Sequence, residues 1–231
     1  QIVRYLDWKV SQINKMIHGY QKQINLLEER KRTLVDKAVT KGINPNAEMK
    51  ESGIYWIGKI PKNWNTISIF RLFTEVKNKN IGMQEKNLLS LSYGNIVRRN
   101  IEATEGLLPA SFEGYNIIEK DDIVLRLTDL QNDHISLRTG IAKERGIITS
   151  AYTTIRNKSK NLSLFLQLQL HVFDLEKGFY NVGASGVRQS LSWDTIKNLL
   201  PAIPSIPEQQ AIVEYIETQT GKINFLKEKI A

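Results

Sequence analysis

The chain has 231 residues, of which 41% are hydrophobic and 24% are charged, so it can form one folded core of ordinary size. It contains no cysteine, which excludes disulfide bonds and thiolate metal sites and favours an intracellular, cytoplasmic location. Its longest apolar run, Leu162 to Phe173, is too short to span a bilayer. The net charge of +8 and the isoelectric point near 9.5 suit a polyanionic partner.

The first forty residues carry a heptad pattern of apolar residues, which is typical of a coiled-coil helix. The apolar steps alternate between three and four, with one break where Lys31 takes an expected apolar place. We expect the helix to end near Thr40–Lys41, because Gly42 is a natural terminator and Pro45 cannot continue a helix. The predicted seam consists of Val3, Leu6, Val10, Ile13, Ile17, Tyr20, Ile24, Leu27 and Leu34.

This segment also holds much of the positive charge. Residues 1–41 contain nine lysines and arginines against four acidic residues, and the rest of the chain contains 23 against 20. Such a charge distribution is typical of a solvated helical face, and equally of a helix that lies beside a phosphate backbone. A helix of about 36 residues is about 54 Å long, which corresponds to roughly 16 base pairs of DNA.

The end of the chain resembles its beginning at a constant offset of 210 residues. Residues 211–231 repeat the pattern of residues 1–21, and the seam positions recur in phase. The repeated residues are Ile2, Val3, Tyr5, Ile13 and Asn14, which recur as Ile212, Val213, Tyr215, Ile223 and Asn224. We therefore expect a globular unit between two copies of one helical spacer, as in a piece of a larger repeating polypeptide. Because the seam needs a partner, pairing with another chain is plausible.

Residues 42–52 read as a polar linker, and a corner rich in tryptophan follows it. Trp56 and Trp64 flank Gly58 and Pro61, and this combination predicts that the linker is anchored on a core. A stacking platform for bases is the functional alternative, but packing is the expected role of both indoles.

Residues 53–207 are predicted to form one domain of mixed α and β structure, so the fold class is α+β with long flanking spacer helices. The expected strands are Leu88–Tyr93, Ile123–Leu127 and Ile147–Ile155. Residues 162–174 and 191–200 have a helical pattern. Three prolines between 201 and 207 precede a final helix that is expected to begin near Glu208.

The sequence lacks the motifs of common catalytic sites. It has no P-loop, no dinucleotide-binding glycine pattern and no nucleophile elbow, and its three histidines lack metal-ligand spacing. Asp122 and Glu144 could form a nuclease pair, but no lysine follows at tight spacing, and turn or capping roles are favoured for the carboxylates. A catalytic nuclease or methyltransferase is therefore disfavoured.

Three polar loops combine the residue types that contact DNA. They are residues 93–100, 128–138 and 180–189, in which arginine could pair with guanine and asparagine or glutamine with adenine. Each loop could also be an ordinary solvated loop, and Arg126, between two leucines, could instead form an ion pair on a sheet face. The candidate DNA contacts chosen from composition are Arg98, Arg99, Arg126, Asn132, His134 and Arg138.

The order of these segments resembles the DNA-specificity (S) subunit of type I restriction-modification systems. The matching stretches are residues 52–64, 115–126 and especially 186–216, which reads GVRQSLSWDTIKNLLPAIPSIPEQQAIVEYI. The resemblance adds Arg188 and Gln189 as DNA contacts, and Gly186 as a point where the backbone could approach a phosphate, although a plain turn is the alternative there.

This resemblance implies a non-catalytic subunit that reads one half of a bipartite DNA site. In that family two helical spacers pair antiparallel, methyltransferase subunits that use S-adenosylmethionine dock onto the subunit, and motor-nuclease subunits can join. By this analogy residues 1–41 are the central spacer, residues 53–207 a target-recognition domain, and residues 208–231 the start of the distal spacer. The chain itself is expected to bind no cofactor or metal. The alternative function is a coiled-coil interaction module without DNA readout.

Overall fold

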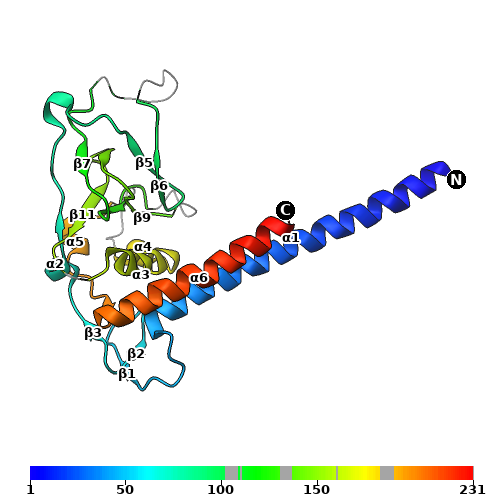
Figure 1. Cartoon of the computed structure of the whole chain (residues 1–231), viewed down its shortest axis with the longest axis horizontal. Helices are drawn as coiled ribbons and strands as arrows, with labels where there is room; N and C mark the ends of the chain where they lie inside the picture. The colour runs from blue at the N-terminus through cyan, green and yellow to red at the C-terminus, as the bar shows by residue number, and fades with distance from the viewer. Residues whose placement is uncertain (102–108, 110, 131–136, 160, 183–189, 231) are drawn as a thin grey trace.

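A computed structural model describes residues 1–101, 109, 111–130, 137–159, 161–182 and 190–230. The longest element is helix α1 (Ile2–Lys41), whose 40 residues span about 60 Å at 1.5 Å per residue. Figure 1 shows α1 projecting far beyond a mixed α and β domain that stands at its C-terminal end. The predicted class, an α+β domain with long helices on its flanks, is confirmed.

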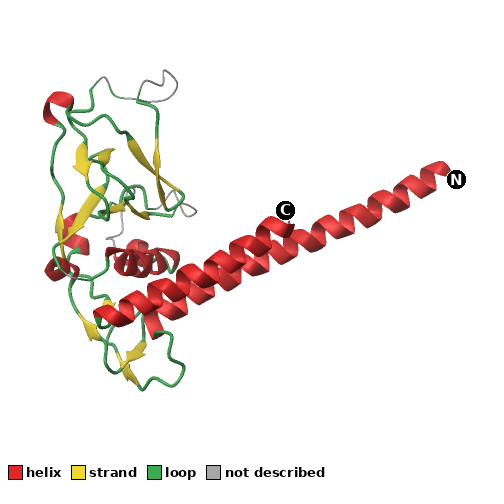
Figure 2. Ribbon diagram, in the orientation of Figure 1, coloured by secondary structure: helices red, strands yellow, loops and turns green. Residues whose placement is uncertain are grey.

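Helix α6 (Ile206–Ile230) runs antiparallel to α1 along the second half of α1, as Figures 1 and 2 show. Glu28 of α1 is paired with Lys227 of α6, and Gly42, just after α1, lies near Glu208 at the start of α6. The seam residues Ile24, Leu27 and Leu34 are half-buried, and α6 buries Ile212, Ile216 and Ile223 in return. The six seam residues from Val3 to Tyr20 are exposed to solvent.

The predicted end of α1 is confirmed, because Gly42 adopts φ 76° and ψ −174° there. This backbone region is essentially restricted to glycine. The segment that follows is more ordered than the predicted polar linker. Residues Met49–Glu51 form strand β1, which pairs antiparallel with β2 (Lys59–Pro61). Lys41 ties the end of α1 to this ribbon, because its ammonium group donates hydrogen bonds to the carbonyl oxygens of Ile57 and Lys59.

The domain is built on a four-stranded antiparallel sheet in the order β4-β11-β8-β9. Its strands are β4 (Phe73–Glu75), β11 (Thr153–Asn157), β8 (Ile123–Leu125) and β9 (Thr139–Ile141). Three two-stranded ribbons complete the β structure besides β1-β2. They pair β5 (Leu89–Ser92) with β6 (Asn95–Arg98), β7 (Asn116–Ile118) with β10 (Gly146–Ile148), and β3 (Asn65–Thr66) with β12 (Ala202–Ile203).

Five short helical elements complete the described structure. They are α2 (Ile69–Leu72), the 3-10 helix η1 (Ile81–Met83), α3 (Ser163–Leu175), α4 (Gly178–Val182) and α5 (Trp193–Ile196). Helix α3 matches the helical pattern predicted for residues 162–174. Helix α6 begins at Ile206, two residues before the predicted start.

Side chains alternate between the two faces of the sheet along each strand, and both faces are buried. Ile123 and Leu125 join the main core, which includes Phe165 of α3 and the fully buried Trp64. Val124, which points the other way, belongs to a second cluster with residues of β5, β6 and β10. The predicted packing role of Trp64 is confirmed. The ring of Trp56 lies 5.1 Å from that of Phe173, which places this indole in the same core.

One predicted strand is divided into two. The expected strand Ile147–Ile155 consists of β10 and β11, because a turn closed by the hydrogen bond from Tyr152 N to Thr149 O separates them. The two halves belong to different sheets. Within the described residues, no helix combines the length and apolar composition that crossing a bilayer requires.

Candidate nucleic-acid interface

The β5–β6 hairpin lies on the side of the domain that faces along the spacer (Figure 1). Its turn consists of Tyr93 and Gly94, with φ of 47° and 78°, as in the type I′ turns that suit the twist of a hairpin. The tyrosine side chain at this tip is 75% exposed. Gly94 lies against Leu137, so the tip is held beside the residues that lead into β9. The hairpin therefore exposes an aromatic ring at a turn that packs against a neighbouring segment.

Arg98 ends β6 and is highly exposed, as a DNA contact requires. Its guanidinium group is held by Glu144 through two hydrogen bonds, one of them 2.7 Å long between Nε and Oε1. The hydrogen bonds from Arg98 hold the pKa of the Glu144 carboxyl below its usual value. A bidentate pair of this kind orients the plane of the guanidinium group. Glu144 was not recognised as a partner of Arg98 in the sequence, because 46 residues separate the two.

Arg99 and Arg126 have different surroundings. Arg99 is exposed, and its backbone N–H donates to Leu88 O at 2.8 Å. Arg126 directly follows β8, is half-buried, and its backbone N–H donates to Arg138 O at 2.8 Å. Both residues remain candidates for DNA contact.

The prediction that Arg138 contacts DNA is corrected by its position inside the domain. The residue is 3% exposed, and its guanidinium group donates to the backbone oxygens of Arg126, Thr128 and Asp129 at 2.8–3.2 Å. Asp174 of α3 lies 4.0 Å from its Nε and accepts a hydrogen bond from its backbone N–H. A guanidinium group held in this way supports the loop from within, which sequence spacing alone could not reveal.

The remaining candidates lie outside the described residues. They are Asn132, His134, Gly186, Arg188 and Gln189. Among the described residues next to these gaps, Leu130 is buried, and Leu191 N donates to Leu127 O at 2.8 Å.

Two carboxylates of the domain, Asp122 and Glu144, pair with arginines. Asp122 is buried, and its two oxygens accept hydrogen bonds of 2.8 and 2.7 Å from Arg156. Glu144 accepts its hydrogen bonds from Arg98, so each carboxylate of the considered nuclease pair has an arginine as its partner. Among the described residues, no group of three His, Asp or Glu side chains could hold a metal ion.

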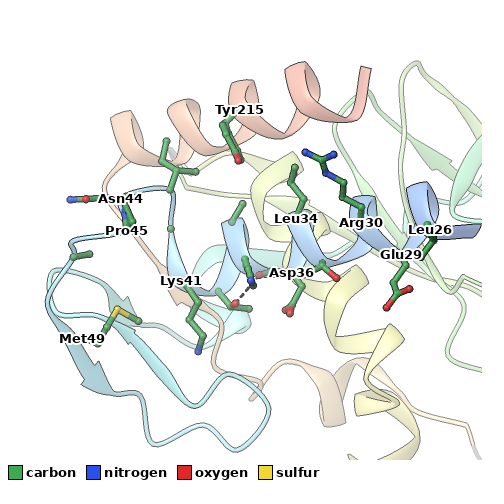
Figure 3. Close-up of a pocket in the computed structure, with 17 residues that line it drawn as sticks. Leu26, Glu29, Arg30, Leu34, Asp36, Lys41, Asn44, Pro45, Met49 and Tyr215 are labelled. Carbon is green, nitrogen blue, oxygen red and sulfur yellow. Dashed lines mark hydrogen bonds between the residues drawn. The ribbon is translucent and has the colours of Figure 1, made fainter. Parts of the chain in front are cut away.

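A groove of about 990 Å³ lies where the helical hairpin meets the domain (Figure 3). Leu26, Leu34, Met49 and Tyr215 contribute apolar walls from α1, β1 and α6. Asp36 lies on the same wall, and burial raises the pKa of its carboxyl. The groove is open to solvent and mixes charged with apolar groups, which is more typical of a protein contact than of a catalytic pocket.

Known proteins resemble this chain in fold. No family model matches it, and no curated protein matches it in sequence. The crystal structure of the HsdS subunit from Thermoanaerobacter tengcongensis superimposes with a TM-score of 0.56 at 14% identity, over 96% of this chain and 50% of that one. The chain has the fold of about half of an HsdS subunit.

A second match comes from a structure that describes complex assembly and conformational transition of the type I R-M system. It has a TM-score of 0.57 at 12% identity and covers 96% of this chain and 53% of that one. The chain therefore spans about half the length of each of these proteins. The HsdS likeness extends over the spacer helices as well as the domain.

Proposed function

We propose that this chain is a non-catalytic, sequence-specific DNA-binding part of a type I restriction-modification specificity subunit, and that it reads one half of a bipartite site. The observation that carries the proposal is the HsdS fold across 96% of the chain, with one domain held at the end of a helical hairpin. In this arrangement the domain supplies the base contacts, and the helical hairpin sets the distance to the other half of the site.

Charge supports double-stranded DNA as the ligand. The chain carries a net charge of +8, and α1 contributes nine basic residues against four acidic ones. Lysines and arginines along a rod favour a phosphate backbone beside it, because bound DNA releases its counterions. The β5–β6 hairpin, which lies on the side of the domain that faces along the spacer, carries the exposed Tyr93 at its turn and the exposed Arg98 at its end, and the exposed Arg99 follows it.

The exposed half of α1 supports binding of protein partners. The seam residues Val3, Leu6, Val10, Ile13, Ile17 and Tyr20 are exposed, whereas the rest of the seam packs against α6. Such an apolar stripe favours association. Methyltransferase subunits, which would bind S-adenosylmethionine themselves, are the partners we propose, and motor-nuclease subunits would join the same assembly. Self-association through this stripe is a further proposal.

Duplex binding by the chain together with its methyltransferase subunits tests the proposal. We expect specific binding that weakens steeply as salt rises, because each neutralised phosphate contributes about 0.9 to the logarithmic salt slope. Fluorescence anisotropy against duplexes selected from a random library would measure both affinity and slope. The absence of duplex binding at low salt in this assembly would refute the DNA function and leave the coiled-coil interaction module.

A catalytic function is tested separately on the purified chain. Incubation with DNA and Mg²⁺, or with DNA and a labelled methyl donor, should give no cleavage and no methyl transfer. The engagement of Asp122 and Glu144 with Arg156 and Arg98 supports this expectation. Turnover by the chain alone would overturn it.

A further inference from the structure

The C-terminal end of the spacer helix α1 is capped by a side chain of the domain. Gln169, in the middle of α3, is 0% exposed, and its Nε2 donates to Val39 O at 2.7 Å and to Ala202 O at 2.6 Å. Val39 O is one of the last four carbonyl groups of α1, which have no partner within the helix. One amide therefore joins the end of α1, α3 and strand β12.

The first turn of α6 is held by a second polar contact. Glu208 accepts a hydrogen bond of 2.9 Å from Trp64 Nε1 and one of 3.0 Å from Asn63 Nδ2. Trp64 is fully buried and meets Phe165 of α3 edge-to-face, with 6.1 Å between ring centroids. A carboxylate is also favoured here by the positive end of the α6 dipole.

A third contact ties α6 to the start of α3. Gln209 is 0% exposed, and its Nε2 donates to Asn161 Oδ1 at 2.7 Å and to Pro204 O at 3.0 Å. Its Oε1 accepts a hydrogen bond of 2.9 Å from the backbone N–H of Leu162, the residue before α3. The end of α1 is therefore bonded to the middle of α3, and α6 is bonded to the residues that precede α3.

Buried hydrogen bonds restrict the direction of a helix more strongly than apolar packing does, because they need defined distances and angles. The direction of α1 matters because the helix is long. A tilt of about 10° at its C-terminal end moves the N-terminal end of this rod of about 60 Å by about 10 Å, roughly three base pairs.

We propose that Gln169, Glu208 and Gln209 are positioning residues that lock the direction of the α1–α6 spacer relative to the recognition domain. The geometric part concerns this chain alone. The consequence for DNA rests on the proposed function: the lock sets how far apart two half-sites must lie for simultaneous binding.

Distance measurement in the full chain tests the lock without DNA. The chain has no cysteine, so Gln12→Cys on α1 and Lys86→Cys in the domain, both exposed, would carry the only two nitroxide labels. Double electron–electron resonance should give one narrow distance distribution for this pair. Glu208→Ala and Gln169→Leu should broaden or shift it, whereas the exposed matched controls Glu217→Ala and Gln210→Leu should not.

Two further variants separate a loss of direction from a loss of folding. Asn63→Ala removes one hydrogen bond at an exposed residue and should broaden the distribution without unfolding the chain. Ile155→Val weakens the sheet core away from the junction and should lower stability with no change in distance. The proposal would be overturned if the distance distribution stayed the same as in the unmodified chain for Asn63→Ala, Glu208→Ala and every folded Gln169 variant.

The DNA consequence has its own readout, in an assembly that carries two recognition domains. An assembly with Glu208→Ala should bind selected bipartite duplexes in which the gap between the half-sites is changed by one or two base pairs and the half-site sequences are unchanged. A broadened distance with unchanged gap preference would overturn the DNA consequence. If no assembly binds duplex, the proposed function fails while the distance result still decides the lock.

Discussion

Lys31 of α1 donates a hydrogen bond of 3.1 Å to Asn224 Oδ1 of α6. Lys31 is the residue that interrupts the apolar seam, and Asn224 is the repeat of Asn14 in the second helical copy. A polar pair at an apolar seam favours the alignment of the helices in which the two groups meet. The interruption in the heptad pattern therefore has a structural role in the register of the spacer.

Replacement of this lysine should stabilise the hairpin and loosen its register. In Lys31→Leu the half-buried position gains apolar area at about 0.8 kcal/mol per methylene and loses one exposed hydrogen bond. We expect a rise of up to about 1 kcal/mol in the free energy of unfolding, measured by urea denaturation. The exposed Lys22→Leu is the control, and a lower midpoint for Lys31→Leu would contradict the prediction.

Arg138 should prove essential to stability. Arg138→Met leaves three backbone oxygens and Asp174 without their buried partner, so we expect a loss of about 3 kcal/mol in the free energy of unfolding. The exposed Arg99→Met should change it by less than about 0.5 kcal/mol. If Arg138 were a DNA contact only, Arg138→Met would unfold at the same urea concentration as the unmodified chain.

Acidification should weaken the packing of α3 against α1 through His171. Burial lowers the pKa of this imidazole, and the nearby charges of Arg32 and Lys31 lower it further. Because the unfolded chain then binds the proton more readily, the contribution of His171 is complete above the ordinary pKa of about 6.5 and declines as pH falls below it. The slope from this single group is at most about 1.4 kcal/mol per pH unit.

His171→Gln removes this titration. We expect a flatter dependence of the free energy of unfolding on pH between about 5 and 6.5. His18→Gln, on the exposed part of α1, is the matched control and should retain the slope of the unmodified chain. An unchanged slope in His171→Gln would assign the acid sensitivity to other groups.

The Arg98–Glu144 pair should tune DNA affinity. Arg98→Ala should weaken duplex binding by the assembled subunit, and if the guanidinium group meets a phosphate the logarithmic salt slope should fall by about one. Glu144→Gln should strengthen non-specific binding, because it removes a negative charge beside Arg98. Anisotropy titrations at several salt concentrations would measure both changes. Identical curves for all three proteins would exclude Arg98 from the interface.

Two glycines of the spacer should respond in opposite ways to alanine. Gly42→Ala forces a side chain into φ 76° and ψ −174°, so we expect a loss of about 1–3 kcal/mol. Gly19→Ala lies inside α1 with open space around its new methyl group and should raise helix stability by up to about 1 kcal/mol. Thermal unfolding followed by circular dichroism would distinguish them, and equal effects would contradict this assignment of backbone strain.

Local pattern was enough to predict the long helix, its end at Gly42, the helix near residues 162–174 and the second helical copy at the end of the chain. These features follow from periodicity and from the conformational limits of single residues, which act over a few positions along the chain. The HsdS likeness could likewise be inferred from the order of segments. The hairpin turn at Tyr93 was only weakly indicated by the sequence, since Tyr-Gly is not among the preferred turn pairs.

Contacts between distant residues decided the rest. Composition assigned Arg138 to DNA, yet the fold surrounds it with carbonyl oxygens from residues 126–129 and a carboxylate 36 positions away. The heptad pattern runs along α1 with one break at Lys31, yet only its second half is covered by α6. Gln169 lies 130 residues from the carbonyl that it caps. Burial and hydrogen-bond partners are properties of the folded chain, so no reading of neighbouring residues could assign them.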